Sequence, residues 1–344
     1  MERKIYQFDD LPPAQAGDDA ASPPFGAARS QRVGVIFSAR SHHNKGREPV
    51  FGERSDVTIV RPQTRRDIAV ALAGFAKEGI GLLVISGGDG TVRDVLTMGQ
   101  SVFGNKWPQL AVLPRGKTNA LNVDLGSPRD WSLTQAIAAF EDPYKGKRVI
   151  RRPLAISQAG SEDPPMLGFI FGAGAFALGV EAGQDAHRAG FFNSLAVGVT
   201  SAWGVVQALF GSDGNVWRRG AKMELEYLPS REPMPHSRHG DPARRTLILA
   251  STLTTMPLDI KLFGKGQKDI RLLLLDHPRR RVLFSVPAIL AGWHPQWLER
   301  AGLHHLSAQG FSITLDSPFI LDGEHFPPGS YRIEQGPELT FVAG

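Results

Sequence analysis

The sequence predicts two domains, an α/β domain built on a parallel sheet followed by a β-sandwich domain. At 344 residues the chain is long enough to bury two separate cores. In the first third of the chain, short apolar runs alternate with helical patterns, as in a sheet that is covered on both faces. From about Val149 onward, short apolar segments are separated by turn signals, which is typical of antiparallel strands.

Three expected strands of the first domain each end in a polar or glycine-rich turn. The apolar runs at 32–37, 81–85 and 110–113 lead into turns at 38–44, 86–91 and 114–119. Apolar spacing predicts a helix over Asp67–Glu78 and a second helix that begins near Val92. Because ligands collect at the carboxyl ends of parallel strands, these turns are the expected binding edge.

The second domain is predicted as a set of short strands with one long apolar helix, at roughly Phe191–Phe210. The stretch Pro229–Pro242, rich in Pro, His, Ser and Arg, is expected to be an exposed loop. The strands are expected at Met166–Phe171, Met223–Leu228, Arg244–Thr252, Ile270–Leu275 and Phe311–Leu315.

Composition limits the possible partners. The net charge of +5 and the pI near 9.5 favour phosphates or an acidic membrane face, while a solvated surface with no special partner stays equally open. The basic clusters Arg151-Arg152 and Arg279–Arg281 have no interleaved aromatic residue, so nucleic acid is not an expected partner. Without cysteine, the chain can form neither disulfides nor thiolate metal sites.

No apolar run approaches the roughly 18 residues of a membrane span. Residues 1–30 contain no apolar core of a signal peptide and are expected to be a disordered tail. We therefore expect a cytoplasmic protein that is at most peripheral at the inner membrane face.

The segment Gly87-Gly88-Asp89-Gly90-Thr91 carries the strongest chemical signal. Glycines allow backbone N–H groups to approach a phosphate closely, and the following helix directs its positive end to the same place. Asp89 offers a carboxylate for Mg²⁺ or for a proton, and Thr91 is a candidate helix cap or phosphate ligand. The alternative is a tight strand-to-helix turn in which Asp89 is merely solvated.

The triplet Gly116-Lys117-Thr118 invites comparison with a P-loop. A P-loop needs a glycine five residues before its Gly-Lys pair, and that position is Ala111, within the expected strand. What remains is a second strand-to-helix turn, in which Arg115 and Lys117 can meet phosphate charge and Asn119 can cap the helix. A basic capped turn without a ligand is the alternative.

The remaining patterns are weaker indications of a functional site. The Gly172-x-Gly174-x-x-Ala177 spacing of a dinucleotide fingerprint falls in the β-rich half and lacks the following acidic residue. Asp322-Gly323 alone indicates a hairpin turn. The histidines show no metal-ligand spacing. Trp293, His294 and Trp297 could meet lipid headgroups, but packing in a core is the favoured interpretation.

Taken together, three motifs resemble the diacylglycerol kinase catalytic-domain superfamily, which includes bacterial lipid kinases and sphingosine kinases and is distantly related to NAD kinases. They are Ser86-Gly-Gly-Asp-Gly-Thr-Val92, Leu113-Pro-Arg-Gly-Lys-Thr-Asn119 and Leu321-Asp-Gly-Glu324, in the family's order and spacing. The resemblance runs from about Arg32 to Gly344. It implies a nucleotide-binding domain at 31–130, a β-sandwich acceptor domain at 131–330, and a terminal strand at 331–344. Whether this strand joins the first domain is left open.

The resemblance also implies roles for individual residues. Glu324 would take the proton of the acceptor hydroxyl with support from Asp322, while Asp89 would work with Mg²⁺ and is the rival base. Asp269 is the remnant of a structural-metal loop. The ATP-binding residues would be Ser86, Gly87, Gly88, Gly90, Thr91, Val92, Arg115, Gly116, Lys117, Thr118 and Asn119, with Arg40 and Asn44 compensating for Ser38-Ala39 where the family has Asn-Pro.

The leading hypothesis is thus an ATP- and Mg²⁺-dependent lipid kinase acting on a diacylglycerol-like or sphingoid lipid. A kinase of a soluble alcohol or nucleotide is one alternative, and a catalytically silent nucleotide- and membrane-binding protein is another. The motifs do not name the lipid, because the shape of the cleft between the domains determines the acceptor. Oligomeric state is not predicted.

Overall fold

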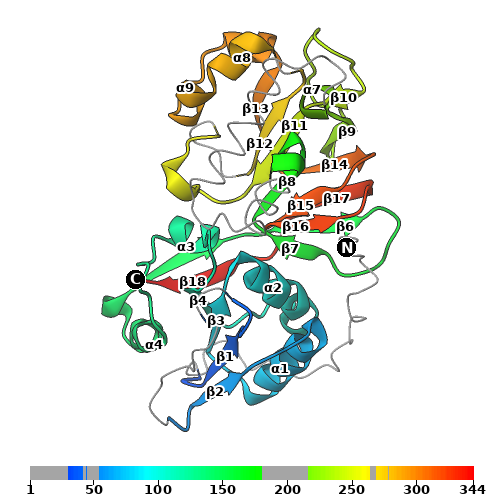
Figure 1. The fold of residues 1–344 in the computed structure, drawn as a ribbon. Helices are drawn as coiled ribbons and strands as arrows, with labels where there is room; N and C mark the ends of the chain where they lie inside the picture. The colour runs from blue at the N-terminus through cyan, green and yellow to red at the C-terminus, as the bar shows by residue number, and fades with distance from the viewer. Residues whose placement is uncertain (1–29, 42–43, 45–53, 180–215, 264–268, 278) are drawn as a thin grey trace.

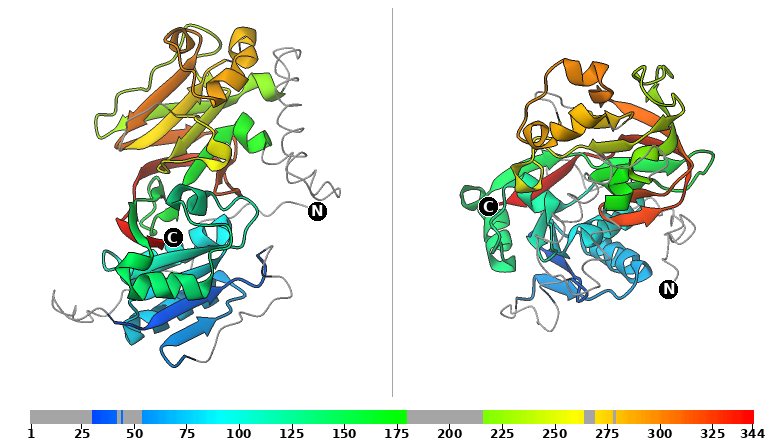
Figure 2. Two further views of the ribbon diagram at one scale, coloured as in Figure 1. Left: turned by 90° about the vertical axis from the view of Figure 1, so that its left-hand side faces the viewer. Right: turned by 45° about the horizontal axis from the view of Figure 1, so that its top comes forward.

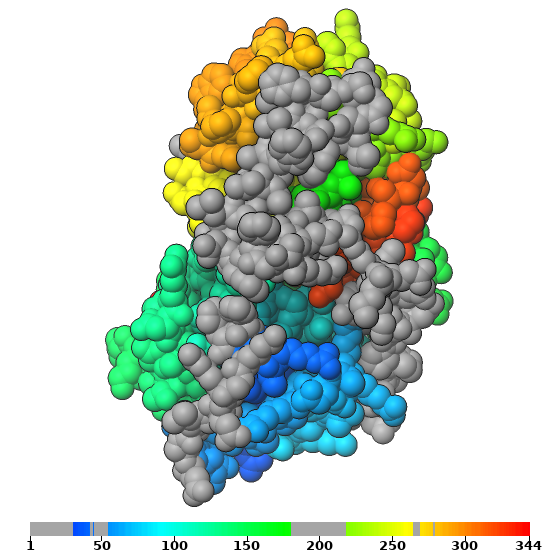
Figure 3. Space-filling model, in the orientation of Figure 1, coloured from blue at the N-terminus to red at the C-terminus, as the bar shows by residue number. Residues whose placement is uncertain are grey.

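The computed structural model describes residues 30–41, 44, 54–179, 216–263, 269–277 and 279–344. They form two domains, with the first domain below the second in Figures 1 and 3. The helix expected at Phe191–Phe210 and the tail expected at 1–30 lie outside the described residues, apart from Ser30.

The first domain is built on a six-stranded sheet with the strand order β2-β1-β3-β4-β18-β5. The first four strands in this order run parallel, β18 runs parallel to β4, and β5 is antiparallel to β18. The strands are β1 (Val33–Phe37), β2 (Val57–Val60), β3 (Leu82–Gly87), β4 (Gln109–Pro114), β5 (Lys147–Arg151) and β18 (Leu339–Ala343).

Helices cover both faces of this sheet (Figure 1). Successive strand residues point to opposite faces, so Leu83 and Ile85 pack under α1, α2 and α3 while Leu82 and Val84 pack under α4. Thr64 caps α1 through a capping box with Asp67, so the helix begins at Arg65, two residues before the predicted start at Asp67. The helices are α1 (Arg65–Glu78), α2 (Asp89–Phe103), α3 (Ala120–Leu125) and α4 (Leu133–Glu141), followed by the 3₁₀ turn η2 (Pro143–Lys145).

Two antiparallel six-stranded sheets form the second domain, in the orders β10-β9-β14-β17-β6-β7 and β13-β12-β11-β8-β15-β16. Their inner faces share one apolar core, in which Phe171, Phe311 and Phe319 are fully buried. This packing of sheet on sheet confirms the predicted fold class of an α/β domain followed by a β-sandwich. The strands are β6 (Leu154–Gln158), β7 (Met166–Gly168), β8 (Ile170–Gly174), β9 (Ala221–Leu228), β10 (Arg244–Arg245), β11 (Leu247–Ser251), β12 (Ile270–Leu275), β13 (Leu303–Ala308), β14 (Gly310–Leu315), β15 (Phe319–Leu321), β16 (Glu324–Phe326) and β17 (Gly329–Gln335).

Short helices lie on the outer side of the second domain, where α8 (Arg280–Phe284) and α9 (Val286–Leu290) are at the top of Figure 1. Val282, Ile289 and Leu298 anchor these two helices and α10 (Trp297–Arg300) in a separate small core against β12 and β13. The other short helices are α7 (Val216–Arg219) and the 3₁₀ turn η3 (Pro257–Asp259), and η3 packs against α3.

The chain crosses between the domains more than once. The first sheet extends past residue 130 to include β5, and β18 brings the end of the chain back between β4 and β5 (Figure 2). Leu339, Phe341 and Val342 are fully buried there. We therefore place the end of the first domain after Arg151, with β18 as a further part of it.

Candidate active site

The first glycine-rich turn joins β3 to α2 at the edge of the sheet. α2 begins at Asp89 with Gly88 at the N-cap, so the helix start expected near Val92 is wrong by three residues. Thr91 consequently lies in the first turn of the helix and does not cap it. A side chain at Gly87 would collide with Thr91, since an added Cβ would lie 2.5 Å from the Thr91 Cβ.

The two glycine-rich turns pack directly against each other. A Cβ added at Gly88 would lie 2.9 Å from the Gly116 Cα, and one added at Gly116 would lie 2.6 Å from the Gly88 Cα. The backbone N–H of Arg115 donates to the Gly87 carbonyl at 3.2 Å. The structure thus brings together the two turns that were singled out separately in the sequence.

Asn119 stands at the N-cap of α3 but uses its side chain differently from the prediction. Its backbone is left-handed, with φ 49°, and its side chain makes no capping bond to the helix. Instead, Oδ1 accepts from the Gly116 N–H at 2.7 Å and Nδ2 donates to the Gly116 carbonyl at 3.0 Å. Asn119 therefore closes the second turn, at whose tip Lys117 and Thr118 are exposed.

Asn44 ties the first polar turn to the end of β3. Its Nδ2 donates to the Ser38 carbonyl at 3.0 Å and to the Ser86 carbonyl and hydroxyl at 3.1 and 3.2 Å. Asn44 and Ser86 are both buried, so they set the position of the glycine-rich turn from below. Arg40, the other candidate in this turn, is exposed.

The Asp89 carboxyl faces the start of α3. Burial raises the pKa of this carboxyl above its ordinary value, and the backbone N–H groups of Ala120, Leu121 and Asn119 oppose the rise. The first residue of α2 thus interacts with the first residues of α3. In this arrangement the Asp89 carboxyl connects the two strand-to-helix turns through the backbone N–H groups at the start of α3.

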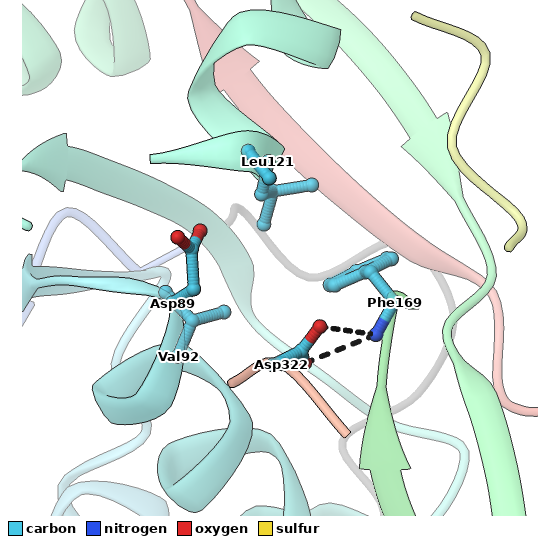
Figure 4. Close-up of a pocket in the computed structure, with 6 residues that line it drawn as sticks. Asp89, Val92, Leu121, Phe169 and Asp322 are labelled. Atoms are coloured by element: carbon cyan, nitrogen blue, oxygen red, sulfur yellow. Dashed lines mark hydrogen bonds between the residues drawn. The ribbon is translucent and has the colours of Figure 1, made fainter. Parts of the chain in front are cut away.

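Asp322 reaches the site from the second domain, on the hairpin between β15 and β16. Asp322 and Gly323 both have positive φ, 46° and 84°, as the predicted Asp-Gly hairpin turn requires. The Asp322 carboxyl accepts from the Ile170 N–H at 2.9 Å and from the Phe169 N–H at 3.1 Å (Figure 4). A turn whose local pattern indicated only a hairpin therefore holds an inward-facing carboxyl.

A small space separates Asp89 from Asp322 (Figure 4). A water-sized probe has about 10 Å³ of room there, and the space is partly open to solvent and otherwise lined by Val92, Ala120, Leu121 and Phe169. Burial first, and the facing Asp89 charge second, raise the pKa of Asp322 to about 7, while Arg93 and the two N–H groups oppose the rise. The two domains therefore meet through a pair of carboxyl groups in apolar surroundings.

Glu324 lies beside the first turn of α2. A Cβ added at Gly90 would be 3.9 Å from Glu324 Oε1 and 3.8 Å from Arg93 Nη2, so Gly90 leaves the space that these two side chains use. The three motifs thus contribute to one site, in which Asp89 and Gly90 come from the first domain and Asp322 and Glu324 from the second.

Arg93 is the residue that the sequence analysis missed. It is 2% exposed, it donates to Asp94 at 2.9 Å, and its Nη1 donates to the Leu321 carbonyl at 3.2 Å across the domain boundary. Burial lowers its pKa, but the charges of Asp94, Glu324 and Asp322 outweigh burial and raise it. The only available signal was an arginine within the apolar pattern of α2.

Comparison with known proteins agrees with this geometry. The family model of the diacylglycerol kinase catalytic domain matches residues 38–145. Residues 38–145 belong to the diacylglycerol kinase catalytic-domain family. This stretch of the kinase domain contains both glycine-rich turns and Asp89. A search of curated proteins found no match.

Solved structures share the fold over nearly the whole chain. One from Bacillus anthracis strain Sterne, provisionally named a diacylglycerol kinase, is 13% identical, with a TM-score of 0.59 over 92% of this chain and 98% of the other. Another from the same strain, described as a diacylglycerol kinase, is 14% identical, with a TM-score of 0.57 over 91% and 97%. At this identity the likeness concerns the fold, and it includes the second domain beyond the kinase-domain match.

Two further observations bear on the kinase domain and its surroundings. Within the described residues, no three His, Asp or Glu side chains gather in a way that could hold a metal ion, and Asp269 stands just before β12 in the chain. No helix among the described residues is long and apolar enough to cross a membrane.

Proposed function

We propose that the protein is an ATP-dependent lipid kinase that transfers the γ-phosphate to a hydroxyl of a diacylglycerol-like or sphingoid lipid. The observation that carries this proposal is the position of Glu324. A carboxylate from the second domain stands beside Gly90, in the first turn of the helix that follows the glycine-rich loop. Transfer to an alcohol requires a site that holds the phosphates and a base near it that can orient the hydroxyl, and these two parts would come from different domains here.

The phosphate end of the proposed site is formed by the backbone. In this proposal the N–H groups of Gly88, Gly90 and Thr91 and the positive end of α2 receive the ATP phosphates. Arg115, Lys117 and Thr118 stand on the adjoining turn, where a cation can meet the phosphate charge. Ser86, Gly87, Val92, Gly116 and Asn119 shape this surface, Asn44 supports it from below, and Arg40 lies on the neighbouring turn.

The acceptor end is the space between Asp89 and Asp322. With about 10 Å³ of room for a water-sized probe, it holds little more than one water molecule and is far smaller than pockets that enclose whole ligands. In this proposal only the acceptor hydroxyl enters the space, and the rest of the acceptor lies outside it. The apolar lining by Val92, Leu121 and Phe169 agrees with an acceptor of lipid character.

The chemical step needs few groups. Glu324 takes the proton of the acceptor hydroxyl while the hydroxyl oxygen bonds to the γ-phosphorus of ATP. The bond from that phosphorus to the oxygen that bridges the β- and γ-phosphates breaks, and ADP is released. Asp322, held by two backbone N–H groups, positions the hairpin that carries Glu324. Arg93 fixes the same hairpin through Leu321.

Mg²⁺ fits the residues of this site. Mg²⁺ typically uses one or two carboxylates together with substrate phosphates and water, and the facing carboxyls of Asp89 and Asp322 would be relieved of their repulsion by a cation. Asp89 would hold the ion, and the ion would supply charge neutralisation for the phosphates. Asp269 has no comparable partner set among the described residues, so we do not propose it as a ligand at this site.

The test is a transfer assay with radiolabelled ATP, Mg²⁺ and a host lipid extract. We expect label in the organic phase, and we expect Glu324→Gln and Asp89→Asn to remove most of it. Label that both variants leave unchanged would overturn the proposed site. Label in the aqueous phase alone would show a soluble acceptor, and thermal stabilisation by ATP without any product would show a silent nucleotide-binding protein.

A further inference from the structure

The helices α8 and α9 present an apolar stripe to solvent on the outer side of the second domain. Ser285 joins them in a nearly helical conformation, so Phe284, Pro287, Ala288 and Ala291 follow one another at helical spacing, and all four are exposed. Phe284 is 67% exposed. The opposite side of the same helices is buried through Val282 and Ile289, so the stripe cannot turn inward without dismantling that core.

Trp293 extends the stripe. It is 49% exposed and packs edge-on against Trp297, with the ring centroids 6.0 Å apart. The Arg281 guanidinium lies over the Trp297 ring at 4.0 Å. Tryptophan with a neighbouring cation is typical of surfaces that sit at the boundary between water and a bilayer.

A second segment lies next to this stripe. The Lys261 N–H donates to the Leu290 carbonyl at 2.9 Å, and the Lys261 side chain passes over Gly292, where an added Cβ would be 3.1 Å from Lys261 Cδ. Three residues earlier, Leu258 is 87% exposed in a left-handed conformation at φ 61°. We name Leu258, Lys261, Phe284, Trp293 and their exposed neighbours Pro287, Ala288 and Ala291 the outer patch.

The charges around the outer patch are mostly positive. Lys261, Arg280, Arg281 and Arg300 are exposed and Arg279 is half-buried, whereas Asp259 and Glu299 are the acidic residues of the same segments. Apolar side chains that project from a basic rim match the headgroup region of an anionic bilayer. A two-fold contact between copies would instead bring two copies of this basic surface together.

The outer patch is connected to the candidate active site. Its η3 end packs against α3, the helix whose first N–H groups face Asp89, and the Thr255 N–H just before η3 donates to Asp124 of α3 at 2.6 Å. Figure 3 shows the yellow to orange surface of these segments at the upper left, continuing down toward the first domain. A bilayer against the outer patch would therefore lie on the side of the molecule where α3 and η3 meet.

We propose that the outer patch is the surface by which the protein docks on an anionic phospholipid bilayer. This inference rests on the proposed lipid kinase function, because an acceptor with two acyl chains resides in a membrane. The surface extends that function by assigning membrane contact to α8, α9 and the η3 segment. It also corrects the expectation that Trp293 belongs to a core.

The experiment is co-sedimentation of the full chain with sucrose-loaded vesicles of phosphatidylcholine, with or without phosphatidylglycerol. We expect binding to the anionic vesicles and a loss of at least about tenfold in partition coefficient for Phe284→Ser with Trp293→Ser and for Lys261→Glu. The matched controls are Tyr144→Ser, a fully exposed aromatic of the first domain, and Lys106→Glu. Both controls should bind like the wild type.

The readouts separate this inference from the kinase proposal. If the paired serine variant misfolds, Phe284→Ser alone and Lys261→Glu still test the surface. Equal vesicle binding by the patch variants and the controls would overturn the outer patch, even if all of them phosphorylate a short-chain diacylglycerol dispersed in detergent. Vesicle binding that depends on the outer patch, without any lipid phosphorylation, would support the docking surface and contradict only the proposed kinase function. A change of mass in solution that depends on Phe284 and Trp293, without a change in vesicle binding, would show a dimer surface and overturn the proposal.

Discussion

Replacing Glu324 with glutamine preserves the size of the side chain and removes its ability to accept a proton. If Glu324 is the base, kcat should fall by about 10²–10⁴-fold. The thermal stabilisation by ATP should persist, because the glycine-rich turn is untouched. Steady-state kinetics and melting curves with ATP provide these two measurements, with Glu232→Gln on an exposed loop of the same domain as the control. Unchanged kcat in Glu324→Gln would move the role of base to Asp89.

Asp322 makes stability depend on pH in a defined direction. Its pKa is raised from 3.8 to about 7, so the folded state holds a proton that the unfolded state releases between these values. Unfolding free energy should therefore fall as the pH rises through this range, because the folded state binds more protons. The unfolding free energy of Asp322→Asn should fall less than that of the wild type over the same pH range. Chemical denaturation at several pH values measures both slopes, and parallel slopes would contradict the raised pKa.

Sequence reasoning at the residue scale succeeded where the backbone itself creates the site. The glycine-rich turns were identified because close backbone approach requires glycine; the structure shows such an approach between Gly88 and Gly116, and the approach to a phosphate stays a prediction. Arg93 could not be found in this way, since its partners Leu321 and Glu324 come from the other end of the chain. Asn119 is the N-cap residue of α3, as predicted, but its side chain makes no capping bond because it is paired with the Gly116 backbone.

At the level of secondary-structure elements, the contact between the two strand-to-helix turns should tolerate no added atom. In Gly88→Ala the new Cβ would meet the Gly116 backbone at 2.9 Å, and neither turn can move aside without shifting α2 or α3. We expect a destabilisation of about 1–3 kcal/mol. ATP-induced stabilisation should also weaken. Denaturant titration with and without ATP gives both quantities.

Gly74 in α1 is the matched control for this prediction. An added Cβ there meets nothing within 4 Å, and the position lies inside a regular helix. Gly74→Ala should therefore stabilise the protein by roughly 0.5–1 kcal/mol. If neither Gly88→Ala nor Gly74→Ala changed the free energy of unfolding, the packing of the two turns would be looser than described.

The elements themselves were largely predictable from apolar spacing. α1 and the strands β9, β10, β11, β12 and β14 lie close to their predicted positions because each has a buried face of regular period, whereas β13 was not predicted. The start of α2 was misplaced because Asp89 and Gly90 carry no apolar signal, although their backbone already turns as a helix. Strand pairing needed the structure, since partners such as β18 and β4 are distant in sequence.

For the molecule as a whole, β18 makes the two domains interdependent. Phe341 belongs to the end of the chain but is fully buried in the first sheet. Phe341→Ala should cost about 3–5 kcal/mol, and the loss should appear in a single transition that both domains share. Calorimetry of the wild type and variant tests this. Two separate transitions, with only the lower one shifted, would show that the domains unfold independently.

The same strand has a consequence for the order of events during synthesis. The place between β4 and β5 stays vacant until the residues of the second domain have left the ribosome, since β18 follows them in the chain. Folding one domain after the other, as many multidomain chains do, therefore cannot complete the first domain early. Until then β4 presents an unpaired strand edge, the kind of surface that promotes aggregation. Expression at a lower temperature or with chaperones should for this reason raise the soluble yield of the intact chain.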